Sequence, residues 1–219
     1  LSEAGQVGAT FYAVWDRLAD IAYAAPNVDQ VREAGADLMS DAVSRAGGIL
    51  ASLLVAALSS TRPAGSAGLP ADLAPRFGLV TSAVGYPGLL GRSQLFRQLA
   101  FLENVAPDWT AKHLLPLLDW THAEARAMCE GYAGGNIGSV RLFTAVKPHL
   151  LSAFHHKGLS DDDLEALFDR LLQVALWHAW GQAPEYELSF PEVRHALAIS
   201  PPAVRRHVSW RLWRIMAEE

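Results

Sequence analysis

The chain has 219 residues, 51% of them hydrophobic and only 19% charged, and its formal net charge is −5. That length allows a buried core, and a charged share below the ~25% of typical soluble domains predicts that neighbouring helices or a partner cover part of the surface. The acidic balance excludes a global attraction to nucleic acid or anionic lipid, so any such contact needs a local basic patch.

The first sixty residues predict two helical stretches. In the first, these apolar residues recur at three- and four-residue spacing: Phe11, Val14, Trp15, Leu18, Ile21 and Ala22. The spacing places them on one face of a helix that ends near Pro26. Asn27 opens a second stretch that runs to Ser60. Within it, Gly47-Gly48 marks either a break between two helices or a close helix contact, and a break is the favoured interpretation.

A run without charge extends from Ala46 to Thr61. It is shorter than the ~20 apolar residues that a bilayer span needs. We therefore predict a buried core helix here, and no membrane contact. Prolines and glycines crowd the next segment, 61–75, which is predicted to be a loop. It would separate N-terminal helices (1–60) from a helical-repeat-like region (76–219).

The region after this loop predicts a series of helices. Phe77 to Val84 is apolar and fits either a helix or a strand, and Tyr86-Pro87-Gly88 predicts a turn. Further helices are expected over 89–104, 107–118 and 140–156.

Helix start signals recur in the second half of the chain. In a capping box, a Ser or Thr side chain accepts from a backbone N–H, and an acid three residues on bonds back to the cap's own N–H. Three pairs fit this pattern: Thr121 with Glu124, Ser160 with Asp163, and Ser189 with Glu192. They predict helices over 121–132, 161–180 and 190–198. A last helix is predicted from Pro201 to Ala217.

Serial helices with almost no strand signal predict an all-α fold. Pairing each helix with the next gives a spacing of roughly 35 to 40 residues, which lies in the range of helical repeats. The residues themselves do not recur from pair to pair. We therefore favour an irregular α-solenoid-like array of antiparallel helix pairs, with a compact helical bundle as the alternative.

The sequence offers no recognisable catalytic constellation. The eight histidines lack metal-ligand spacing, and His155 and His156 project from different sides of one helix. The segment 64–68 lacks the first glycine of a nucleophile elbow. The glycine-rich segment 131–138 follows a helix, so it is expected to end that helix, with an anion site at the next helix N-terminus as the alternative. We predict no enzyme activity, no cofactor and no metal in these residues.

The cysteine content indicates a cellular setting. Cys129 is the only cysteine, so no internal disulfide can form, and no secretory signal is recognisable. A reducing, cytoplasmic location is expected. The chain lacks an initiator methionine at Leu1 and ends abruptly after a helix, which indicates a segment of a longer polypeptide.

The last helix carries the one candidate surface, a group of arginines and tryptophans: Arg205, Arg206, Trp210, Arg211, Trp213 and Arg214. An inner stripe is expected at Val204, Val208, Leu212 and Ile215. Arg and Trp are enriched at interface hot spots, and basic residues with aromatics also suit nucleic acid. The structural alternative is a solvated basic face whose tryptophans pack on further helices of a longer polypeptide.

Three groups of residues carry a resemblance to a known family: Leu114 to Trp120, Arg141-Leu142-Phe143 with Lys147-Pro148, and Val204-Arg205-Arg206 with Trp210 and Trp213. They resemble the helical region that follows the catalytic domain in some large bacterial SIR2-like antiphage defence proteins. The resemblance covers the second half of the chain. It implies an NAD-consuming catalytic part outside these residues and a helical region that serves as scaffold or sensor. No catalytic residue of that family can be placed here.

The leading hypothesis is a non-catalytic, cytoplasmic helical module of a larger bacterial protein. Its partners would be another protein, other domains of the parent chain, or further copies of itself. The second hypothesis is a nucleic-acid-binding module that uses the basic last helix. The third is a helical enzyme whose site converges only in three dimensions.

Overall fold

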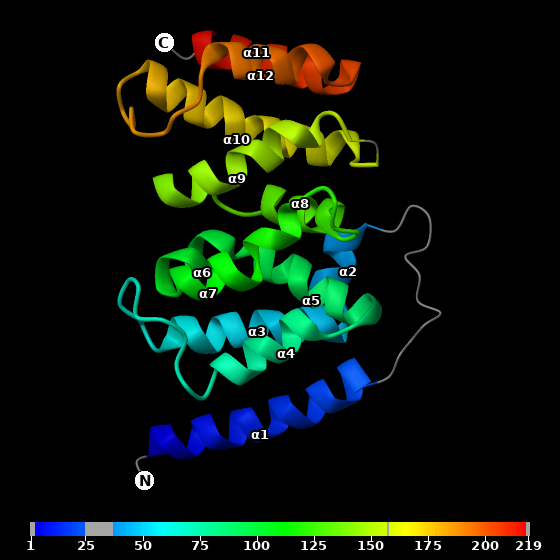
Figure 1. Ribbon diagram of the computed structural model, residues 1–219, viewed down its shortest axis with the longest axis vertical. Helices are drawn as coiled ribbons and strands as arrows, with labels where there is room; N and C mark the ends of the chain where they lie inside the picture. Colours follow the sequence, from blue (N-terminus) through cyan, green and yellow to red (C-terminus); the bar gives the residue numbers. More distant parts are fainter. Residues whose placement is uncertain (1–2, 25–36, 157, 218–219) are drawn as a thin grey trace.

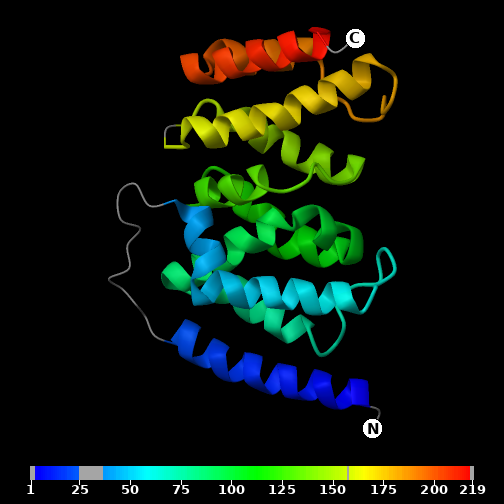
Figure 2. The same cartoon turned by 180° about the vertical axis from the view of Figure 1, so that it is seen from behind.

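A computed structural model describes residues 3–24, 37–156 and 158–217. All regular structure in these ranges is helical, which confirms the all-α prediction. The helices lie in layers along the long axis, with α1 (Glu3–Ala24) at one end and α11 (Phe190–Ile199) and α12 (Pro202–Ala217) at the other (Figure 1). The view from behind shows the same order (Figure 2).

The remaining helices lie between these ends. In chain order they begin with α2 (Leu38–Ser44), α3 (Ala46–Ser60), α4 (Ala74–Ser82), α5 (Gly85–Arg97) and α6 (Leu99–Val105). They continue with α7 (Pro107–His113), the 3-10 helix η1 (Leu115–Leu118), α8 (Ala125–Ala133), α9 (Val140–Ala153) and α10 (Asp161–Ala179). α3 packs mainly on α5, α5 on α8, and α10 on α12.

A single hydrophobic cluster runs through the layers, from Trp15 in α1 to Val208 in α12. The loop between α3 and α4 therefore does not separate two cores. The loop itself is tied to the end of α6, because the N–H of Ser66 donates to the carbonyl of Asn104 at 2.8 Å. The layers follow chain order, as in a helical array, and share one core, as in a bundle.

Two of the three predicted capping boxes are confirmed. The hydroxyls of Ser160 and Ser189 accept from the backbone three residues on, and the acid at that position bonds back in both cases. The prediction at Thr121 is wrong. There the Asp119 carboxylate accepts both the N–H and the hydroxyl of Thr121, which closes a turn instead of starting a helix. α8 accordingly begins only at Ala125.

The glycine pair at 47–48 has a different role from the favoured prediction. The break falls at Arg45, where the axes of α2 and α3 differ by 68°, and the glycines open α3. A Cβ on Gly48 would lie 1.8 Å from the carbonyl oxygen of Ala42, and one on Gly47 2.1 Å from that of Pro87. The close-contact alternative is therefore correct for the glycines. The expected start of this stretch at Asn27 lies outside the described residues.

Three further boundaries differ from prediction. The predicted turn at Tyr86-Pro87-Gly88 is the first turn of α5, where a proline lacks only an N–H that would have no helical partner. The helix expected over 89–104 is divided at Gln98, which leaves the helical conformation. The helix expected over 107–118 ends at His113, because Pro116 obstructs the carbonyl of Lys112, and the chain continues as η1. The segment of uncertain type after the loop is the helix α4.

No single helix in the described ranges combines the length and hydropathy of a membrane span. Only α2 and α3 taken together reach that composition, and they meet at the 68° bend. Most of the inward positions of α3 are buried, including Leu50, Leu54 and Leu58. The apolar run that begins at Ala46 is thus a core helix, as the sequence predicts.

Candidate functional site

The first half of α12 fixes the helix to α10. Val204 and Val208 are buried between the two helices. Beside them, His207 lies 3.3 Å from the Glu165 carboxylate through Nδ1 and 3.0 Å from the Asp169 carboxylate through Nε2. Arg211 adds a contact of 3.5 Å to Asp169. This arginine therefore faces α10 and is partly neutralised.

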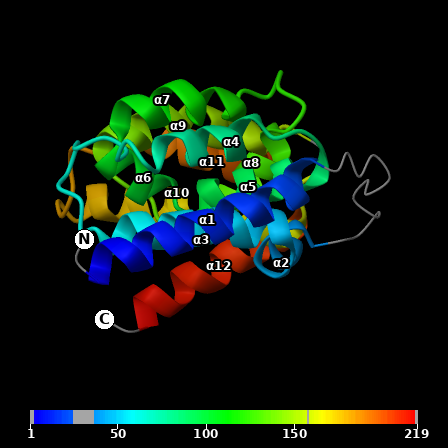
Figure 3. The same cartoon turned by 90° about the horizontal axis from the view of Figure 1, so that it is seen from below.

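The second half of α12 extends away from the other helices, as the view from below shows (Figure 3). Leu212 is exposed and Ile215 only half-buried, so the predicted inner stripe is correct at its first two positions and not at Leu212. No element in the described part of the chain covers these last turns.

The outer face of α12 brings most of the predicted surface residues together. Arg206, Trp210 and Trp213 follow the i, i+4, i+7 spacing of one helix face. The tryptophans are 49% and 64% exposed, which is unusual for such large apolar side chains. The Arg214 guanidinium lies 5.1 Å from the centre of the Trp210 ring, a cation–π contact that holds the indole in place. Arg205 is also exposed.

α12 itself contains no acidic residue. Among the described residues, the carboxylates that contact α12 are those of Glu165 and Asp169 in α10, and they are engaged by His207 and Arg211. The outer face is therefore a cationic and aromatic surface, here named the α12 face: Arg205, Arg206, Trp210, Trp213 and Arg214. Such a surface can bind a carboxylate-rich and apolar ligand by charge pairing and indole burial.

A hollow of about 510 Å³ lies between α9 and α11. Its lining contains His155 and His195, whose ring centres are 5.5 Å apart. Sequence spacing could not reveal this pair, because His155 follows the end of α9 whereas His195 lies in α11. Glu192 also lines the hollow. Burial alone would raise the pKa of Glu192, but the N–H and hydroxyl of Ser189 and the ammonium of Lys147 hold it below its ordinary value. The Glu192 carboxylate thus already accepts from the cap residue Ser189 and pairs with Lys147.

Two other histidines stack on tryptophans. The ring of His156 stacks on Trp120 with 4.1 Å between centres, and that of His113 stacks on Trp109. In the described part of the chain, no group of three or more His, Cys, Asp or Glu side chains is arranged to hold a metal ion.

Cys129 is buried in α8. Burial, followed by the neighbouring Glu130 carboxylate, raises the pKa of its thiol to about 12. A thiol of such high pKa stays protonated at neutral pH and is a poor nucleophile. Cys129 therefore packs in the core as a small hydrophobic residue.

The glycine-rich segment after α8 is explained by close packing. A Cβ on Gly131 would lie 2.4 Å from the carbonyl oxygen of Ser93, and one on Gly135 2.5 Å from that of Arg97, so α8 approaches α5 closely at both points. The N-terminus of the next helix, α9, is capped by Ser139, whose hydroxyl donates to Glu103 at 2.9 Å. A carboxylate of the protein itself therefore lies where an external anion was the alternative prediction.

Comparison of the chain with protein-family models, with curated proteins and with solved structures gave no match. The surfaces described above are therefore interpreted from their own chemistry.

Proposed function

We propose that the chain is a non-catalytic helical scaffold whose α12 face binds an acidic, partly apolar segment of a protein partner in the cytoplasm. One observation supports this above all others. Two exposed tryptophans and the exposed Arg206 share one face of a helix that carries no acid, and the exposed Arg205 and Arg214 flank this face on either side. Trp and Arg dominate the energetics of protein interfaces because each combines apolar area with directional polar contact.

The partner chemistry follows from the charges. An exposed arginine fork prefers carboxylates, and an indole beside it favours an apolar or aromatic neighbour. A bacterial defence protein with an NAD-consuming part elsewhere is the proposed setting, on the basis of the sequence resemblance alone. The helical layers would then carry the sensing or scaffolding role.

A photo-crosslinking amino acid in place of Trp213 tests the proposal in bacterial cells that express the full-length protein. The expected product is a cross-link to an acidic segment of a second protein, which Arg206→Glu abolishes. Arg62→Glu, which reverses an exposed charge in the loop after α3, is the matched control and should leave the cross-link intact. A cross-link confined to the same polypeptide contradicts the proposal.

Nucleic acid is the second candidate ligand, because accessible indoles can stack on bases and no acid of α12 repels phosphate. The measurement is fluorescence anisotropy with labelled single-stranded and duplex oligonucleotides. Affinity that falls steeply with salt, and that is lost on alanine substitution of Arg205, Arg206 and Arg214, supports this candidate. If those variants bind the oligonucleotides as tightly as the unaltered chain does, nucleic acid is excluded as the ligand.

A further inference from the structure

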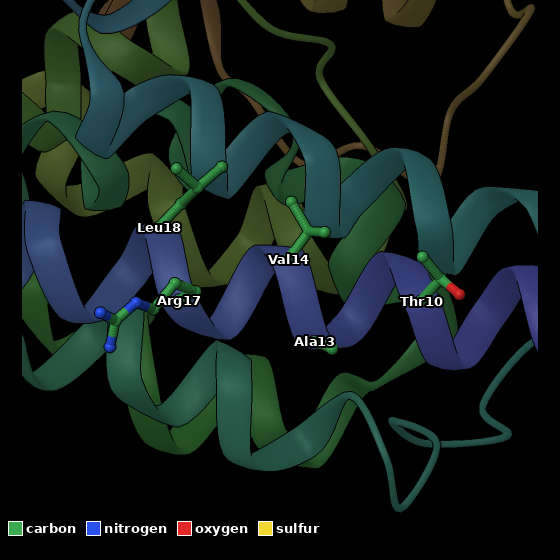
Figure 4. A pocket seen from close by; sticks show the side chains of 5 residues that line it. All are labelled: Thr10, Ala13, Val14, Arg17 and Leu18. Carbon is green, nitrogen blue, oxygen red and sulfur yellow. The ribbon is translucent and has the colours of Figure 1, made fainter.

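The hollow beside α1 does not bring polar groups together. It has a volume of about 560 Å³, and its described lining consists of Thr10, Ala13, Val14, Arg17 and Leu18. Figure 4 shows Thr10, Val14 and Leu18 projecting on the side of α3, with Ala13 and Arg17 on the other side of the helix. The sequence placed Val14, Leu18 and Ile21 on one face with the buried Trp15, and this is wrong, because the three are 55%, 47% and 64% exposed. This hollow therefore lacks the paired donors that the hollow between α9 and α11 contains.

The hollow between α9 and α11 contains two histidine rings with available nitrogens. His155 and His195 are both exposed, and their rings lie 5.5 Å apart with 40° between their planes. Among the described residues, no hydrogen bond or ion pair engages either ring. By contrast, His207 lies between two carboxylates, and His122 accepts the N–H of Glu124. The nitrogens of the pair are thus free to bind a ligand.

Packing holds the backbone at both histidines in place. Phe154, which precedes His155, is buried, and its ring lies edge-on against Phe168 of α10. Ala196, which follows His195, is 1% exposed, and the start of α11 is fixed by its capping box. Two exposed side chains therefore extend from fixed positions into one hollow, and they can adjust their rotamers without moving the helices.

The separation of the two rings suits one shared metal ion. A Zn²⁺ ion lies about 2.0 to 2.1 Å from each imidazole nitrogen that it binds, and hence about 3 Å from the centre of that ring. Two rings bound to one tetrahedral ion then have their centres about 5 Å apart. The 5.5 Å between His155 and His195 is close to this value.

The protein supplies two ligands and not three. Within the described ranges, no group of three or more His, Cys, Asp or Glu side chains is arranged around one point. Glu192 lines the same hollow, but its carboxylate accepts from Ser189 and pairs with Lys147. The other positions of a bound ion are therefore left to water. Imidazole ligands favour Zn²⁺, Ni²⁺ and Cu²⁺, whereas Mg²⁺ and Ca²⁺ prefer oxygen ligands.

We propose that His155 and His195 together bind one divalent transition-metal ion, such as Zn²⁺, which links the end of α9 to α11. The proposal revises the sequence-based prediction of no metal, which rested on the spacing of histidines along the chain. The pair and the α12 face belong to different helices. The metal site therefore does not depend on the proposed function, and either can fail without the other.

Equilibrium dialysis of the chain against Zn²⁺ alone tests the site. We expect one ion per chain, which an excess of Ca²⁺ does not displace. His155→Ala and His195→Ala should each weaken binding by at least about tenfold, since even an outer-shell partner of a metal ligand contributes that much. His178→Ala, which removes an exposed histidine in the last turn of α10, is the matched control and should leave the affinity unchanged.

Nitrogen NMR of the histidine rings identifies the ligands independently of affinity. Zn²⁺ should shift the ring nitrogens of His155 and His195 and leave those of His178 in place. Unchanged circular dichroism verifies that the variants fold. Binding weaker than about 1 mM overturns the proposal. So does a single-alanine variant that retains the affinity of the unaltered chain, because the two histidines would then bind separate ions.

Discussion

Arg92 shows how much a single side chain can connect. It is only 5% exposed, and its guanidinium forms a two-pronged pair with Glu124 at 2.6 and 2.5 Å. A third nitrogen donates to the carbonyls of Thr81 and Ala83 at the end of α4. One arginine therefore joins α5 both to the end of α4 and to the residue that precedes α8.

Arg92→Gln should lower the free energy of unfolding by about 3 kcal/mol, because it leaves the Glu124 carboxylate and the two carbonyls without their donor. Urea denaturation measures the loss. Arg97→Gln, on the exposed side of the same helix, is the matched control and should cost less than about 0.5 kcal/mol. Equal losses for both variants would mean that the Arg92 pair adds nothing to stability.

The capping residues show what local sequence can and cannot predict. At Ser160 and Ser189 the sequence pattern and the structure agree, since both capping boxes form. Thr121 fits the same pattern, but Asp119, two residues earlier, takes its N–H and hydroxyl first. Whether a helix starts at such a residue depends on which local hydrogen bond forms. The spacing of the cap residue and the acid three residues on does not show that another side chain competes for that bond.

At the scale of helices, two glycines distinguish the intrinsic cost of glycine in a helix from the requirements of close packing. A glycine inside a helix normally costs about 0.5 to 1 kcal/mol relative to alanine. Gly78 in α4 has nothing within 4 Å of an added Cβ, whereas Gly48 in α3 has the carbonyl oxygen of Ala42 at 1.8 Å. The same substitution should therefore have opposite effects at the two positions.

Gly78→Ala should raise the free energy of unfolding by about 0.5 to 1 kcal/mol. Gly48→Ala should lower it by about 1 to 3 kcal/mol, because the new methyl group forces α2 and α3 apart. Thermal unfolding of the two variants beside the unaltered chain makes the comparison. A Gly48→Ala variant more stable than the unaltered chain would contradict this prediction, because it would show that α2 and α3 can move apart without loss of stability.

The elements themselves were largely predictable, since apolar periodicity and prolines act within one turn. The division at Gln98 was not predicted. The close approach at Gly131 was not predicted either, and that at Gly47 was only the second of two alternatives, because the partners Ser93 and Pro87 are distant in sequence. The candidate site was predicted in part for the same reason. Arg206, Trp210 and Trp213 belong to one helix, but the engagement of Arg211 depends on Asp169 in α10.

At the scale of the whole molecule, burial is uneven along the stack. α3, α5 and α8 form its centre, whereas α12 buries only Val204 and Val208 and α1 packs on one side alone. Regions with few buried contacts open at a lower free energy than the core. The ends of the stack are thus its least stable layers.

Hydrogen exchange followed by mass spectrometry should find the slowest amides in α3, α5 and α8 and the fastest helical amides in the second half of α12. Exchange in α12 as slow as in α5 would contradict this order.

The first and last described helices, α1 and α12, lie at opposite ends of the long axis (Figure 1). Tension applied between them would pull across the layers in series. Each boundary would then be opened by peeling, which breaks contacts a few at a time, and not by shearing a whole interface at once. Such a molecule is mechanically soft at its ends and should lengthen in small steps under load, while its central layers still hold.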